Sequence, residues 1–100
     1  MLEAFTASTF SPHVGEAFLI DAGAEAPFEL ELISAEELDS RFRSPDAPRV
    51  PFSIMFRGPP KLSLPQRTYT MEHETIGAFE IFLVPIGPDE HGLRYEAVFN

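Results

Sequence analysis

Apolar and polar residues alternate along much of this chain, which is the pattern of β-strands with one buried and one solvated face. The clearest case is Phe28–Leu32, where apolar residues alternate with two glutamates, and this strand can extend toward Leu38 unless Ala35–Leu38 forms a helical turn. Further stretches with strand character bring the expected number to about six: residues 16–21, 28–32, 51–58, 67–74, 78–84 and 93–99.

Residues 6–15 carry the signals of a short helical turn. Ser11 can cap it, Pro12 suits the first helical position and Gly15 can end it. Ten prolines and six glycines divide the remaining 100-residue chain into short elements. The sequence therefore predicts an all-β fold, a compact antiparallel barrel or sandwich of about six strands with one short N-terminal helical turn, in a single domain over residues 1–100.

Phenylalanine supplies most of the expected core. In the strand register above, six of the ten phenylalanines point inward: Phe18, Phe28, Phe52, Phe56, Phe79 and Phe99. The strand over residues 78–84 is apolar on both faces, so we expect it to be central in the sheet, or to be covered by the N-terminal segment or by another subunit. Cysteine is absent, which excludes disulfides and cysteine-based metal sites.

The chain is acidic, with 16 Asp and Glu against 7 Lys and Arg, for a formal charge of −9. A polyanion repels phosphate, so we expect neither nucleic acid nor an anionic membrane as a partner. The first ten residues lack a basic region, and no apolar run has the length of a signal or membrane segment. We therefore expect no signal peptide, and a location in the cytoplasm or within a larger assembly.

Basic residues concentrate in the middle of the chain, between residues 41 and 67. Phe42 lies between two arginines in a long proline-containing loop over residues 39–50, where it either anchors an interface or packs back onto the domain. The arginines can likewise form an interface or pair across strands with Glu29 and Glu31. The candidate interface comprises Arg41, Phe42, Arg43, Arg49, Arg57, Lys61 and Arg67.

His73 lies between Glu72 and Glu74 and superficially resembles a metal or acid–base motif. In a strand, however, His73 points away from both glutamates, so the three cannot converge on one ion without a β-bulge. We expect a core histidine that is hydrogen-bonded to a backbone or hydroxyl partner. His13 and His91 lie in connections, and the chain has no calcium loop, phosphate-binding glycine loop or serine elbow. We therefore expect no catalytic residues, metal or cofactor.

Four stretches resemble a family of small uncharacterised bacterial proteins of about this length: VGE at Val14–Glu16, PFSIMFRG at residues 51–58, LPQRTYTMEHE at residues 64–74 and LVPIGPDEHGLRYEAVFN at residues 83–100. Relatives of that family occur near phage tail-collar-like proteins. The resemblance implies an accessory or structural role in a tail-like or surface assembly, and it supplies no catalytic residues.

The sequence thus favours a non-enzymatic domain that works by protein–protein contact, as a homo-oligomer or as a subunit of a larger particle. The alternative is a small-ligand-binding barrel with a pocket lined by Tyr69, Met71 and His73, which requires an internal void. A third hypothesis, a hydrolase or metalloenzyme, requires two of the histidines to approach each other or a carboxylate in a concave site.

Overall fold

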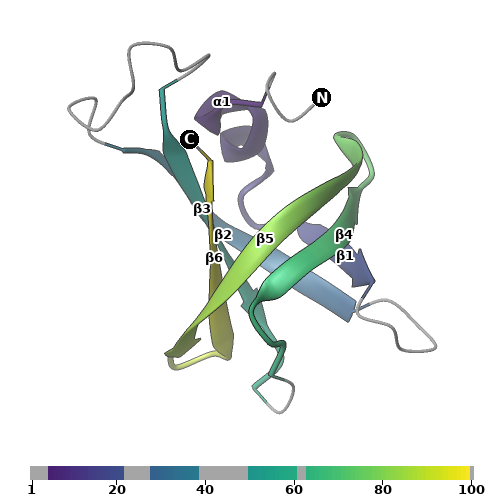
Figure 1. Cartoon of the computed structure of the whole chain (residues 1–100), viewed down its shortest axis with the longest axis vertical. Coiled ribbons are helices and arrows are strands. Elements are labelled where there is room, and N and C mark those ends of the chain that lie inside the picture. The colour runs from purple at the N-terminus through teal and green to yellow at the C-terminus, as the bar shows by residue number, and fades with distance from the viewer. Residues whose placement is uncertain (1–4, 22–27, 39–49, 61–62, 100) are drawn as a thin grey trace.

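The computed structural model describes residues 5–21, 28–38, 50–60 and 63–99, and its strands close into a β-barrel (Figure 1). Neighbouring strands are antiparallel throughout, in the order β1-β2-β3-β6-β5-β4, and β4 pairs with β1 to complete the wall. The all-β prediction is confirmed, as a barrel rather than a sandwich. The strands are β1 (Ala17–Asp21), β2 (Phe28–Glu37), β3 (Phe52–Gly58), β4 (Arg67–His73), β5 (Gly77–Pro88) and β6 (Leu93–Phe99).

Two strands extend beyond their predicted ends. β2 remains a strand through Glu37 and pairs there with Phe52 of β3, so the helical alternative for Ala35–Leu38 is wrong. β5 continues past Pro85 to Pro88, with a shift of register between Pro85 and Gly87. Such an irregularity lets a proline, which has no N–H to donate, lie within a paired strand.

The N-terminal segment covers one end of the barrel (Figure 1). It forms α1 (Ala7–Phe10) and the 3-10 turn η2 (Ser11–His13), and the predicted helical turn is therefore present. The Thr6 N–H donates to Thr9 Oγ1 at 3.0 Å, so Thr6 rather than Ser11 is the residue at the start of the helix. Pro12 lies in the first turn of η2, as its lack of an N–H favours.

Phe10 is the centre of the core at this end. Its ring is fully buried and lies between 5.4 and 6.4 Å, centroid to centroid, from the rings of five other phenylalanines, namely Phe5, Phe18, Phe52, Phe79 and Phe99. Phe52 and Phe99, which are direct cross-strand partners, stack at 4.6 Å. Five of the six predicted core phenylalanines are buried, while Phe28 is partly buried and packs against the core.

The two apolar faces of β5 have different surroundings. On the inner face, Phe79 meets Phe5 and Phe10, so the N-terminal segment packs against this side of the strand. On the outer face Phe82 is 50% exposed. In a closed barrel every strand has two neighbours, so a central position does not account for the outer apolar residues. The described part of the chain leaves Phe82 half exposed and Val84 partly buried.

None of the helices in the described ranges is long and apolar enough to span a bilayer.

Candidate functional site

Three places on the barrel bring polar or exposed apolar side chains together. One is a histidine cluster at the C-terminal end of β4, and another is an arginine–aspartate pair near the C-terminal end of β3. The third is an outer face formed by β3, β6 and β5. Of the predicted interface residues, only Arg57 and Arg67 fall in the described ranges. The others lie outside the described residues: Arg41, Phe42, Arg43, Arg49 and Lys61.

The histidine cluster consists of His13, Glu16 and His73. The Glu16 carboxylate lies 2.9 Å from His13 Nδ1 and 2.7 Å from His73 Nε2, both measured to the same oxygen, Oε1. The two imidazole rings lie edge to face with centroids 4.5 Å apart. His73 is buried, whereas its chain neighbours Glu72 and Glu74 are exposed, in keeping with the alternation of a strand.

The hydrogen bonds of His73 fix the position of its proton. The backbone N–H groups of Thr75 and Ile76 both donate to His73 Nδ1, at 3.1 and 3.2 Å. Nδ1 must therefore be the unprotonated nitrogen, so Nε2 carries the hydrogen of the neutral ring and donates it to Glu16. The predicted backbone partner of His73 is present, and the carboxylate is an additional partner that the sequence did not indicate.

Glu16 accepts from two histidines, and its protonation reflects this. An ionised carboxylate can only accept hydrogen bonds, so His13 donates to Glu16 through Nδ1. The hydrogen bonds from His13 and then His73 lower the pKa of Glu16 below its ordinary value. The cluster is therefore a carboxylate held ionised between two histidine donors.

The same three side chains satisfy the distance criterion for a metal site, because one ligand atom from each lies within 4.8 Å of the others. Two histidines have also approached each other, which is the condition set above for an enzyme or metal site. Metal binding through His73 Nε2 would move the remaining ring proton to Nδ1, where it would meet the N–H groups of Thr75 and Ile76. Metal-bound histidines instead direct their second nitrogen at an acceptor, so the surroundings of His73 do not fit a ligand.

An open groove of about 450 Å³ runs along the outer wall beside this cluster. Its floor and walls include Leu19 of β1, Ala78 of β5 and the two exposed glutamates Glu72 and Glu74, and His73 reaches its margin. Because the groove is open to solvent and lies outside the barrel, it differs from the enclosed internal pocket that the ligand-binding hypothesis requires.

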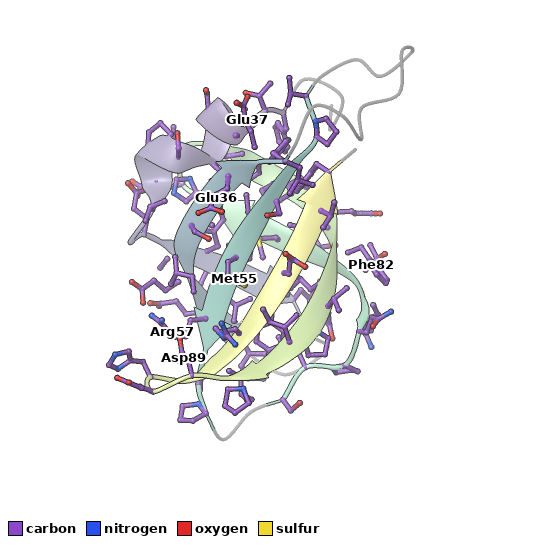
Figure 2. The ribbon with its side chains drawn as sticks, turned by 90° about the vertical axis from the view of Figure 1, so that its left-hand side faces the viewer. Glu36, Glu37, Met55, Arg57, Phe82 and Asp89 are labelled. Atoms are coloured by element: carbon purple, nitrogen blue, oxygen red, sulfur yellow. The ribbon has the colours of Figure 1, made fainter. Side chains whose placement is uncertain are left out.

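Arg57 and Asp89 form the second cluster, at the opposite end of the barrel from Glu36 and Glu37 (Figure 2). Arg57 Nε lies 2.9 Å from Asp89 Oδ2, and a second guanidinium nitrogen contacts the same oxygen. Asp89 Oδ1 also accepts from the N–H groups of His91 and Gly92, at 2.8 and 3.0 Å. Arg57 and these backbone donors hold the pKa of Asp89 far below its usual range.

The sequence offered Glu29 and Glu31 as cross-strand partners of the arginines, and the observed partners of Arg57 agree with this only in part. Glu31 is a partner, at 3.9 Å, but Asp89 in the β5–β6 connection is the closer and bidentate one. Arg57 is thus engaged within its own chain. Arg67 is exposed at the start of β4, with its guanidinium 4.8 Å from the centroid of the Tyr69 ring. The role of both residues in an interface stays a prediction.

The residues predicted to line a ligand pocket lie in the packed interior. Tyr69 and Met71 are 2% and 0% exposed, and the Tyr69 hydroxyl donates to the carbonyl oxygen of Pro65 at 2.6 Å. Burial raises the pKa of Tyr69. Their role in binding a ligand stays a prediction, and the side chains around them are core residues.

The outer β6 face, as we call it, combines exposed apolar groups with two charges. Phe82 and Val98 are half exposed, and in Figure 2 Phe82 projects away from the barrel wall. Cross-strand register places Glu96 of β6 between two partly buried apolar residues, Met55 of β3 and Val84 of β5. The face is defined by Met55, Phe82, Val84, Arg94, Glu96 and Val98.

The sequence did not predict several of the contacts in these sites. His13 and His73 lie far apart in the sequence, and only closure of the barrel brings the N-terminal turn to the end of β4. The three-residue spacing of His13 and Glu16 was a local signal that a turn would bring them together. For Asp89, the following Glu-His-Gly was the signal of a turn in which an aspartate accepts from nearby backbone N–H groups.

A family model described as a domain of unknown function, DUF6916, matches residues 5–99, which is nearly the whole chain. Neither the curated proteins nor the solved structures contain a match to this sequence.

Proposed function

Because the chain belongs to the DUF6916 family, a domain of unknown function, we propose a role for it from its own geometry: a non-enzymatic protein-interaction or structural domain. One observation carries the proposal. The barrel interior is filled by buried aromatic and aliphatic side chains, while Phe82 and Val98 remain half exposed on its outer wall. The surface available for binding is therefore the outside of the barrel.

The outer β6 face suits a protein partner. Exposed aromatic and aliphatic groups supply the apolar centre of an interface, and surrounding charges set its specificity. Phe82 and Val98 are supported by rigid strands whose inner residues are fixed in the core, so the face changes little on binding. A flat or convex wall of this kind matches a protein surface better than a small molecule.

The partner, in this proposal, is a second copy of the chain or another protein subunit. The resemblance to relatives near phage tail-collar-like proteins supports a place as an accessory component of a phage-tail-like or surface assembly. The net charge of −9 supports a protein rather than nucleic acid or an anionic membrane as the partner. The protein would act in the cytoplasm or within such an assembly.

Site-specific photocrosslinking in cells of the native host tests this proposal. A photoreactive amino acid at Val98 reports on the outer β6 face. The same amino acid at Glu72, exposed on β4, which β5 separates from β6, is the matched control. We expect a protein adduct from position 98 and little from position 72. Equal adduct formation at both positions, or none at position 98, would contradict the proposal.

A further inference from the structure

Arg94 and Glu96 carry opposite charges, lie on the same strand, β6, and have no ion-pair partner among the described residues. Both are partly buried on the outer face of the strand. Arg94 Nε is covered, yet no hydrogen-bond acceptor in the described part of the chain reaches it. This nitrogen is shielded from solvent by its own chain, so an acceptor on another molecule can approach Arg94 only through the rest of its guanidinium group.

The cross-strand neighbours of Arg94 offer its guanidinium no carboxylate. Its cross-strand neighbour on β3 is Arg57, whose guanidinium is already held by Asp89. Its neighbour on β5 is Gly87, which has no side chain to cover the Arg94 guanidinium. The nearest carboxylate on its own strand, Glu96, is two residues away on the same face, a separation of about 7 Å along an antiparallel strand.

We infer that a second copy of this chain covers the outer β6 face, an inference that rests on the proposed function. The two copies are related by a two-fold axis that lies between their faces, perpendicular to β6 and at the level of Tyr95. Such an axis reverses the strand, so Arg94 of each copy faces Glu96 of the other, and the pair forms twice. Met55 and Val84, which flank Glu96 on the two neighbouring strands, provide apolar contacts around these pairs.

Charge complementarity favours a second copy over an acidic partner of another kind. An acidic peptide would satisfy Arg94 but would place its carboxylates beside Glu96. A reversed copy of the same face satisfies the arginine and the glutamate together.

Charge reversal with light scattering after size-exclusion chromatography tests the inference. We expect the wild-type protein to have twice the 11.2 kDa chain mass. Arg94→Glu and Glu96→Arg should each weaken self-association about tenfold or more, because like charges then face each other. An equimolar mixture of the two variants should restore the dimer, because each altered residue then meets an opposite charge on the other chain.

Glu72→Arg is the matched control for Glu96→Arg, since it changes the net charge equally at an exposed position of β4 and should leave the dimer intact. A monomeric wild type, dimers unaffected by the two single reversals, or a mixture that stays monomeric would each overturn the reversed-copy arrangement. The crosslinking from Val98 reports separately: an adduct to a different protein together with a monomeric wild type retains the proposed function and removes this inference.

Discussion

His73 Nε2 and Glu16 Oε1 lie 2.7 Å apart although 57 positions separate the two residues in the chain. This hydrogen bond ties the end of β4 to the residue that precedes β1, next to the ladder that closes the barrel. The other side of the His73 ring accepts the N–H groups that open the turn toward β5. His73 therefore joins the end of β4 to the start of β1 and to the turn before β5. This structural role accounts for its hydrogen bonds to Glu16, Thr75 and Ile76.

The proton position on His73 can be observed directly. In long-range ¹⁵N–¹H correlation spectra of the neutral ring, we expect the Nε2–H tautomer, because Nδ1 accepts from two backbone donors. His91 serves as the reference histidine in the same spectra, because in the described part of the chain no pair of backbone N–H groups donates to its ring. An Nδ1–H tautomer at His73 would contradict the hydrogen-bond assignment and would reopen the metal hypothesis.

Asp89 should make stability depend on pH in acid. Its folded-state pKa is depressed by Arg57, so the unfolded chain binds more protons and stability falls as pH decreases from about 4 toward 2. Above about pH 5 this contribution is fully present. Asp89→Asn keeps the shape and the acceptor for His91 and Gly92 but removes the titration. Urea unfolding at a series of pH values should show a smaller acid loss in the variant, and an identical pH profile would contradict the pairing.

Phe10 should be among the most costly core positions to truncate. Its ring meets five other phenylalanine rings where α1 closes the barrel, so Phe10→Ala leaves a cavity that the rigid wall cannot fill. We expect a loss of about 3–5 kcal/mol in the free energy of unfolding, measured by urea denaturation. Phe82→Ala, at a half-exposed position on the outer wall, is the control and should cost much less. Equal losses at the two positions would contradict the description of the core.

Gly92 should not tolerate a side chain. A Cβ added there would lie 2.2 Å from the carbonyl oxygen of Gly58, so Gly92→Ala must displace the backbone where β3 meets β6. We expect a loss of about 1–3 kcal/mol, together with amide shift changes around Asp89, whose oxygen accepts the Gly92 N–H. An alanine variant as stable as the wild type, with unchanged spectra, would show that the two strands are further apart than described.

The barrel was largely predictable because its strands alternate with a strict period of two. Phe52, Ile54 and Phe56 are buried while Ser53, Met55 and Arg57 between them are partly exposed, as the residue pattern of β3 indicates. The period alone could not distinguish a barrel from a sandwich, because that depends on whether β4 pairs with β1. The extension of β5 through Pro85 depends on a register shift that the sequence marks only by its proline and glycine.

The candidate sites were less predictable because they combine residues from distant segments. His73 was singled out by its neighbours, but its partners Glu16 and His13 come from the other end of the chain. Arg94 drew no attention in the sequence, because the acceptor it lacks can be recognised only from the burial of its Nε. Five of the seven predicted interface residues lie outside the described residues, so that part of the prediction stays open.

Protection of the outer wall from a soluble paramagnetic probe is the most direct test that this face is a contact surface. Methyl signals of Met55, Val84 and Val98 are compared at low and high protein concentration, with Leu19, exposed on β1, as the reference. We predict that the three signals become protected at high concentration while Leu19 keeps its relaxation enhancement. Equal enhancement of all four signals at every concentration would contradict it.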